Sequence, residues 1–438
     1  HGDEHGDEHG DEHGDEHGDE HGDEHGDEHG DEHGEEEDEF ISIKLKQTRY
    51  DARLVLQSPS ENIEKLKGFL TYTDYEHAEM EGSELGTLFT RKTWETRLEL
   101  EHNLFWGTEG VFGIQARVDE FAAQGAEGYV PKTDSTEIGV FLVEDFEKGD
   151  WLYEVGVRGD YTQRDPESRI TSKQNFSNFS LSGSTLWQFS DHWQVGGGVS
   201  RSERAPAAEE LFSNVESIDL EDLITHPATA VIEVGDPDLK KETSFNADLA
   251  LEWHSDQSWA DLVFFYNQFE NYIFLLDTGT EVDEVPVYSY IQEDAIFYGI
   301  EFESSFMLGE LGPGIISLDV HGDYISAEFD SSGDVPRMPP TRIGGKLMWT
   351  NDAFTTWLSV LNAGDQKNPG EMENETSGYT RWDFGAEYQF QTSQNGEGVV
   401  FVKWKNITDE EIRLSTSFLR NYAPEAGASV EAGIRFTF

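Results

Sequence analysis

From Ile41 to the end of the chain, apolar and polar residues alternate with a period of two. The segments 153–161, 245–253, 298–306 and 429–438 place apolar side chains at every second position and mostly polar or small ones between them. Because successive side chains of a strand point to opposite sides, this alternation predicts β-strands with one apolar and one polar face. No convincing amphipathic helix interrupts the pattern, so the predicted fold class is all-β.

About seventeen such segments follow one another, beginning near residues 41, 63, 85, 106, 135, 151, 177, 193, 240, 259, 285, 314, 341, 355, 377, 398 and 429. Over the 399 residues of 40–438, each strand with its connection takes about 23 residues, well above the 8–12 of a soluble sandwich. Tight connections, such as 147–150 and 191–192, alternate with long ones, such as 202–240 and 406–428. The spacing predicts a large antiparallel barrel.

The placement of polar residues decides between a soluble barrel and a membrane barrel. The chain has 54 aromatic residues, 12% of the total, which crowd the strand ends, and one face of the strand near 314 carries Asp319, His321 and Asp323. A polar lumen and an apolar outer face with aromatic girdles are typical of outer-membrane barrels. No apolar stretch reaches the roughly 20 residues of a membrane-spanning helix. We therefore expect a transmembrane antiparallel β-barrel in contact with lipid, in the outer membrane of a Gram-negative-type bacterium.

Charge narrows the choice of partners. The chain has 90 acidic and 30 basic residues and no cysteine. The first 39 residues hold 21 of the acidic residues and nine of the fifteen histidines but no Lys or Arg, so the remaining 399 residues still carry 69 acidic against 30 basic groups. Nucleic-acid binding needs a basic surface, so it is not expected. Without cysteine there are no disulfides and no thiolate ligands or nucleophiles.

Residues 1–39 are a low-complexity segment, predicted to be separate from the barrel at 40–438. The tetrapeptide His-Gly-Asp-Glu occurs eight times from His1 to Glu32, and no apolar residue precedes Phe40. A glycine at every fourth position and the lack of anything to bury predict a segment that is disordered in isolation. Counting strands back from the C-terminus places this segment in an extracellular loop. Because single-chain barrels of bacteria have an even number of strands, the odd count predicts further strands upstream of His1.

The repeat has the composition of a metal-binding segment. Neutral imidazole and carboxylate groups together suit zinc, copper or nickel, and repetition provides many weak, exchangeable sites. The predicted ligands are His1, His5, His9, His13, His17, His21, His25, His29 and His33. The alternative is a solvated acidic loop without a metal role. The H-x-x-E-H zinc-hydrolase pattern also matches each unit, but it requires one helix face, so no enzyme activity is expected.

Several longer motifs occur in order along the barrel region. They are Tyr72 to Glu79 (YTDYEHAE), Ser202 to Phe212 (SERAPAAEELF), His226 to Glu242, Met338-Pro339-Pro340, and Asn406 to Glu411 with Ser417 to Arg420. Together they resemble the TonB-dependent receptors of bacterial outer membranes, and among these the zinc-uptake type. The resemblance spans essentially all of 41–438. It implies a barrel of about 22 strands, an even number as in other such barrels, filled by a plug domain and energised by a TonB-type coupling protein.

The chain departs from that family pattern at its front. Seventeen of the expected strands are counted, and no signal peptide, energy-coupling box or plug is recognised before the first one. The resemblance therefore implies the C-terminal part of a receptor, coupled to its energy source through a missing N-terminal region.

The resemblance also implies discrete site residues. His77 and Glu79 lie near the outer end of the second predicted strand, and His226 lies in the long loop before residue 240. In the zinc branch, residues at such positions are expected to help bind the metal; the alternative is that they are ordinary polar loop residues.

The expected function is that of an outer-membrane receptor or transporter for zinc, another divalent metal or a metal chelate, with no cofactor required beyond that ligand. Two alternatives remain open. One is a siderophore receptor of the same family. The other is a passive porin or adhesin whose acidity, still −39 outside the repeat, reflects a saline habitat.

Overall fold

Strands form where the alternation predicts them. The computed structural model describes residues 41–81, 84–103, 108–125, 128–217, 219–226, 229, 231–371, 373–392 and 396–437. Its long strands are β1 (Ile41–Ser60), β2 (Ile63–Glu81), β3 (Glu84–His102), β4 (Glu109–Gly125), β5 (Thr133–Lys148), β6 (Trp151–Pro166), β7 (Gln174–Ser190), β8 (Trp193–Arg204), β11 (Glu242–His254), β12 (Trp259–Val282), β13 (Val285–Leu311), β14 (Gly314–Phe329), β15 (Arg342–Thr350), β16 (Phe354–Ala363), β17 (Tyr379–Gln391), β18 (Glu397–Lys405) and β19 (Ser429–Thr437).

The connection between β8 and β11 contains four short elements: α1 (Ala208–Phe212), a 3₁₀ turn (Leu220–Asp222), β9 (Thr225–His226) and β10 (Val231–Val234). These two brief helical turns were not expected from the sequence. In the ranges that the structure describes, no helix has both the length and the apolar character needed to cross a membrane.

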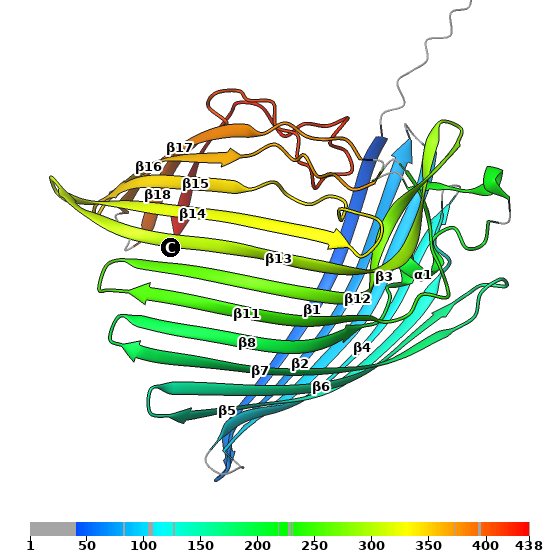
Figure 1. Ribbon diagram of the computed structural model, residues 1–438, viewed down its shortest axis with the longest axis horizontal. Coiled ribbons are helices and arrows are strands. Elements are labelled where there is room, and N and C mark those ends of the chain that lie inside the picture. The colour runs from blue at the N-terminus through cyan, green and yellow to red at the C-terminus, as the bar shows by residue number, and fades with distance from the viewer. Residues whose placement is uncertain are drawn as a thin grey trace, which may run out of the picture. The chain divides into compact units, whose positions relative to one another are not determined.

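The seventeen long strands form one antiparallel meander (Figure 1). β1 to β8 pair in sequence order, β8 pairs with β11, and β11 to β19 again pair in order. Among the described strands, β1 and β19 each pair with one neighbour. The predicted all-β fold and its seventeen strands are confirmed, and each strand begins within three residues of its predicted start.

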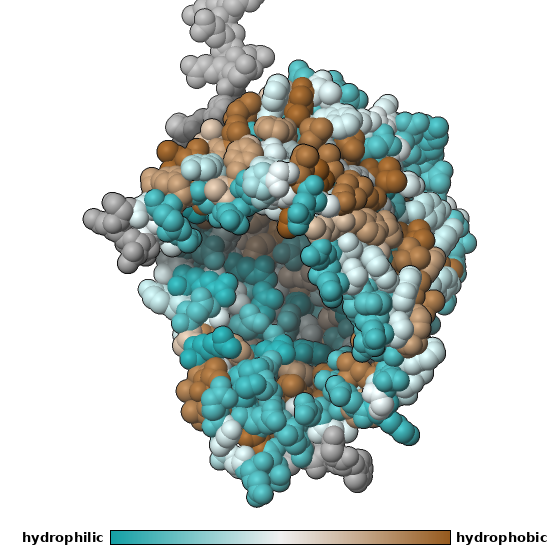
Figure 2. Space-filling view, turned by 90° about the vertical axis from the view of Figure 1, so that its left-hand side faces the viewer, coloured by the Kyte–Doolittle hydropathy of each residue, from teal (hydrophilic) through white to brown (hydrophobic). Residues whose placement is uncertain are grey.

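The two faces of the sheet differ in polarity. Outward-facing positions hold large apolar side chains that are about half exposed, among them Leu54, Leu98, Leu249 and Leu347. The opposite face carries ion pairs between residues two positions apart on one strand, including Arg49–Asp51, Arg97–Glu99, Arg158–Asp160 and Arg381–Asp383. Figure 2 shows a hollow lined by hydrophilic side chains and bordered by hydrophobic ones. A polar interior and an apolar exterior are what a barrel needs in lipid.

Aromatic side chains gather near the tight turns. Trp151 stacks on Trp187 with ring centroids 5.1 Å apart, and the ring contacts continue through Phe189 and Trp193 to Trp253. The predicted crowding of aromatics at strand ends is therefore present in the structure. Such a belt places amphipathic rings at one membrane–water interface.

Leu249→Arg is expected to destabilise the folded barrel by about 2–4 kcal/mol, because it places a cation on the lipid face near the middle of β11. Leu249 pairs with Phe264 of β12 and is 52% exposed. Urea unfolding of the chain in phospholipid vesicles, followed by tryptophan fluorescence, measures the change. The adjacent Ala250→Arg, which points to the opposite face, serves as the matched control and should cost much less. An equal cost for both would contradict the assignment of the faces.

The long connections lie at the opposite end of the strands, which we term the loop end. They comprise residues 205–241, 330–341, 364–378 and 406–428, between consecutive long strands. The pairing between β13 and β14 ends at the pair Ala295–Phe329, so the first ten residues of β13, 285–294, have no partner in β14. The free edge of this segment pairs in parallel with β10, with Ile232 opposite Val287. The β8–β11 loop therefore adds one strand to the outer part of the β12–β13 hairpin.

A buried carboxylate joins the other loops. The Glu373 side chain, 8% exposed, accepts from Arg420 at 3.0 Å and lies 3.6 Å from the Arg337 guanidinium. It also accepts hydrogen bonds from the backbone N–H groups of Arg337 and Gly370. The Arg337 guanidinium lies 4.3 Å from the ring centroid of Phe418. Glu373 thus holds together the connections at 330–341, 364–378 and 406–428.

Candidate functional site

Arg204, the last residue of β8, contacts both the beginning of the following loop and the strand that comes after it. Its guanidinium binds the Glu210 carboxylate at 2.9 and 3.1 Å and Glu242 at 2.7 Å. The Glu210 carboxylate also accepts a hydrogen bond from the backbone N–H of Ala207 at 2.7 Å. This N–H lies at the start of α1, where backbone donors have no partner within the helix. Arg204 therefore joins the end of β8, helix α1 and the first residue of β11. This network accounts for Arg204 and Glu210, the arginine and the third glutamate of the 202–212 motif.

Helix α1 is anchored by its apolar side. Leu211 and Phe212 are fully buried and pack in one cluster with Ala208, Leu239 and Ile273. The chain passes close to α1 again at Gly235, whose N–H donates to Ser213 O at 2.8 Å. A Cβ at residue 235 would lie 2.6 Å from the Phe212 backbone nitrogen, so this approach requires glycine. Because β10 ends at Val234, the residue before Gly235, this close approach to α1 also sets the position of β10.

A chain of ring contacts connects His77 to His226. His77 of β2 stacks on Phe89 of β3 with centroids 4.4 Å apart, and Phe89 lies 6.3 Å from Tyr129 in the β4–β5 connection. Tyr129 in turn lies 4.7 Å from His226 of β9. Four segments that are distant in the sequence therefore meet at the loop end. We call His77, Glu79, Tyr129, His226 and Glu233 the histidine cluster.

Carboxylates surround the ring of Tyr129. Burial, followed by the charges of Glu233, Glu209 and Glu79, raises the pKa of the Tyr129 phenol, so the phenol stays neutral. Glu79 and Glu233 are only 7% and 5% exposed. Glu79 Oε1 lies 3.8 Å from His77 Nε2. Glu79 Oε2 and His77 Nδ1 are buried and have no hydrogen-bond partner among the described residues. Burying a carboxylate is costly unless it is paired and hydrogen-bonded.

His226 is held differently from His77. Its Nδ1 lies 2.8 Å from Glu233 Oε1, and Glu233 also accepts from Thr229 and from the Tyr290 hydroxyl, each at 2.9 Å. Burial alone would raise the pKa of Glu233, but the contacts with His226, Tyr290 and Thr229 outweigh it and hold that pKa below its usual value. The carboxylate is therefore ionised at neutral pH.

The structure brings His77, Glu79 and His226 into one cluster, and it adds Tyr129 and Glu233, which sequence reasoning missed. In the described part of the chain, no three side chains of His, Asp or Glu are close enough together to hold a metal ion. The metal-binding role of the three residues stays a prediction. The nine histidines of the repeat, His1 to His33, lie outside the described residues. His321 lies on the polar face, where its ring packs against Gly344.

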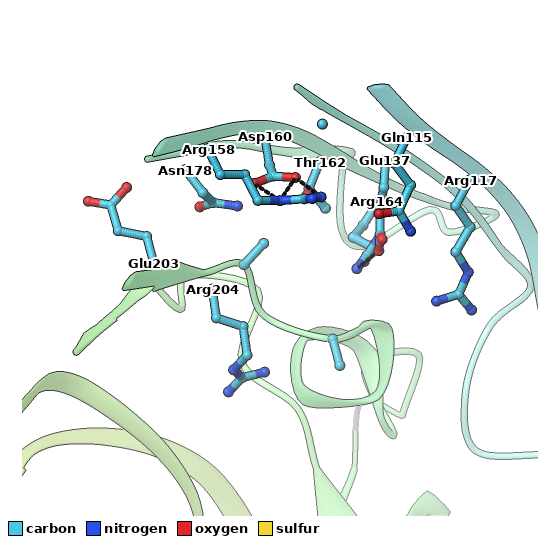
Figure 3. A pocket seen from close by; sticks show the side chains of 13 residues that line it. Gln115, Arg117, Glu137, Arg158, Asp160, Thr162, Arg164, Asn178, Glu203 and Arg204 are labelled. Carbon is cyan, nitrogen blue, oxygen red and sulfur yellow. Dashed lines mark hydrogen bonds and ion pairs between the residues drawn. The ribbon is translucent and has the colours of Figure 1, made fainter. Parts of the chain in front are cut away.

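A polar cavity of about 340 Å³ lies between the start of α1 and the strands β4 to β8 (Figure 3). Its lining includes four arginines, Arg117, Arg158, Arg164 and Arg204, although only 30 of the 438 residues are basic. Arg164 binds Glu137 at 2.7 Å, while its Nη1 is buried and has no hydrogen-bond partner among the described residues. The cavity thus combines several cations with at least one unused donor.

Comparisons with known proteins identify the class of this barrel. Residues 11–408 match the family model described as TonB dependent receptor-like, beta-barrel. The iron-regulated outer membrane virulence protein of Vibrio cholerae serotype O1 is 25% identical over 263 residues, 56% of this chain and 38% of the relative. This chain therefore spans well under half of that curated relative.

Solved structures share the fold. The copper transporter OprC matches with a TM-score of 0.73 at 15% identity, covering 90% of this chain and 66% of OprC. The FrpB iron transporter of Neisseria meningitidis (F5-1 variant) has a TM-score of 0.69 at 13% identity, with 90% and 64% covered. The siderophore receptor PirA of Acinetobacter baumannii has a TM-score of 0.59 at 14% identity, with 90% and 71% covered.

The fold and the polarity of its faces define an outer-membrane β-barrel of the receptor class. The chain belongs to the TonB-dependent receptor family, through the β-barrel domain of that family. The predicted outer-membrane location is confirmed by the family and by the named outer-membrane relative. The matched proteins carry the names of transporters or receptors, in agreement with the expectation that the chain is not an enzyme.

Proposed function

We propose that this barrel captures zinc, as the bare ion or as a metal chelate, at its loop end, with transport energised by a TonB-type protein in the complete receptor. The observation that carries the proposal is the buried Glu79 carboxylate, whose Oε2 lacks a hydrogen-bond partner among the described residues, next to His77. Imidazole nitrogen and carboxylate oxygen are ordinary zinc ligands. A divalent cation at this point would compensate the buried charge.

The spacing of the cluster bears on the form of the cargo. The rings of Phe89 and Tyr129 lie between His77 and His226. A fully dehydrated zinc ion needs four ligands in a tetrahedron, whereas a hydrated or chelated ion brings some of its own. We infer that partly hydrated or chelated ions bind at two partial sites, one at His77 and Glu79 and the other at His226. The repeat would collect the same ions through its exchangeable imidazole and carboxylate groups.

The test is zinc binding by the full chain folded in detergent micelles, measured by isothermal titration. We expect His77→Ala and Glu79→Gln to lower the affinity of the first partial site, and His226→Ala that of the second, each at least about tenfold, because each removes a metal ligand. His192→Ala is the matched control, because this histidine contacts the backbone oxygen of His254, away from the cluster. Unchanged affinity in all three variants would rule out both partial sites. No zinc binding by the wild-type chain would leave the siderophore receptor and the porin or adhesin as alternatives.

A second candidate, an anionic metal chelate such as a siderophore, is favoured by the arginine-lined cavity. Arginine presents several donors in a fork that matches carboxylate groups. The same titration with an anionic ferric chelate in place of zinc distinguishes the candidates. Binding of the chelate that is lost in Arg164→Ala, but not in His226→Ala, would support the siderophore receptor.

A further inference from the structure

Glu233 occupies a rigid position. It belongs to β10, which pairs in parallel with β13, and its neighbour Ile232 is 1% exposed. Its backbone oxygen accepts from the Asn214 side chain at 2.8 Å, and Asn214 Nδ2 also donates to Ile224 O, close to β9. The Glu233 carboxylate is therefore set by the backbone of a paired strand and not by a free loop.

The contacts of Glu233 determine which nitrogen of His226 carries its proton. The Glu233 carboxylate acts as the acceptor for the hydroxyls of Thr229 and Tyr290, and a carboxylate oxygen is likewise the acceptor in a contact with a ring N–H. Since Glu233 Oε1 lies 2.8 Å from His226 Nδ1, that nitrogen must be the donor. A neutral imidazole with its proton on Nδ1 has its lone pair on Nε2. A tilted contact with the Tyr129 ring, with centroids 4.7 Å apart and planes at 34°, restrains the plane of the imidazole.

From this geometry we infer that Glu233 is a positioning residue that orients His226 to bind the metal through Nε2; the inference rests on the proposed function. A histidine that ligates a metal commonly donates its other ring N–H to a carboxylate, which sets the tautomer and raises the basicity of the ligating nitrogen. Tyr290 and Thr229 complete the arrangement, because their hydroxyls hold the Glu233 carboxylate in place. His77 lacks such a partner among the described residues.

Two measurements on the full chain in detergent micelles test the inference. The first is the ¹⁵N spectrum of histidine-labelled apo protein, which distinguishes the two tautomers; the signal of His226 is the one missing in His226→Ala. The second is titration with zinc alone. We expect the Nδ1–H tautomer in the wild type. In Glu233→Met we expect a mixed tautomer and about 10- to 100-fold weaker zinc binding, the range found when such partners are removed.

Two further variants guard against a general loss of structure. Glu233→Gln keeps the size of the side chain but not its charge, so we expect a smaller loss of affinity with the loop intact. Glu293→Gln is the matched control: Glu293 also ties a loop at this end, through Ser331 and Ser332, but it does not contact His226. It should leave the tautomer and the affinity unchanged.

The outcomes separate the two proposals. Unchanged tautomer and affinity in both Glu233 variants, while His226→Ala loses affinity, would overturn the role of Glu233 and leave the metal site standing. Equal losses in Glu293→Gln would also overturn it, because the effect would then belong to the loop in general. If the wild type binds no zinc, the proposed function fails, and the apo tautomer alone then decides whether Glu233 orients His226.

Discussion

Glu373→Ala is expected to loosen three loops at once, by about 3–5 kcal/mol, because it leaves a buried arginine without its counter-charge. Arg420, whose side chain is 9% exposed, lies 3.0 Å from Glu373 Oε1, and Arg337 lies 3.6 Å from the same oxygen. The loss of the carboxylate also removes an acceptor for two backbone N–H groups. Hydrogen exchange of peptides from 330–341, 364–378 and 406–428 should accelerate together, while the strands stay protected.

Glu371→Ala is the matched control for that experiment. Glu371 lies two residues earlier and is exposed. Its replacement should change stability by less than about 0.5 kcal/mol, as surface substitutions usually do. If only the 364–378 peptides respond to Glu373→Ala, Glu373 stabilises its own loop and does not join the three.

Phe212→Ala should detach the β8–β11 loop from the barrel wall. Deleting a fully buried phenylalanine typically costs about 3–5 kcal/mol, through lost burial and the cavity left behind. Phe212 packs with Leu239 and Ile273, and Gly235 passes close to its backbone. Peptides covering 205–241 should lose protection from hydrogen exchange, and zinc binding that depends on His226 should weaken with them.

Leu220→Ala provides the comparison within the same loop. Leu220 is 59% exposed, so its removal creates no cavity. We expect no measurable change in exchange or binding. If Phe212→Ala leaves the protection of 205–241 unchanged, the loop is held by its backbone pairing with β13 and not by the Phe212 cluster.

The strands were predictable from the sequence because a barrel wall repeats one simple rule, an apolar side chain toward lipid at every second position. Strands such as β11, with Leu249 and Leu251 on one face, follow it throughout. His77 and Glu79 could be placed at the outer end of β2 by the same counting. The confirmed part of the prediction is therefore the part that periodicity controls.

The contacts that make up the histidine cluster were not predictable in this way. β10 has four residues, too few for a two-residue period to be recognised. Its parallel pairing with β13 joins residues about 55 positions apart, so the neighbouring sequence does not indicate it. Glu233 lies in the 226–242 motif, but it is one of 90 acidic residues and the motif alone does not predict its contact with His226. Tyr129 comes from a connection whose path depends on what packs against it. These contacts are tertiary, and only the folded loops determine them.

The pairing of β10 with β13 has a consequence for the order of folding. Neighbouring hairpins of the barrel close through contacts that are local in sequence, whereas β10 must find an edge that exists only after β12 and β13 have paired. Contacts between distant segments form late, because the loop between them must be closed first. The wall of the barrel can therefore be complete while His226 and Glu233 are still unassembled. The histidine cluster is expected to be the last region to fold and the first to open.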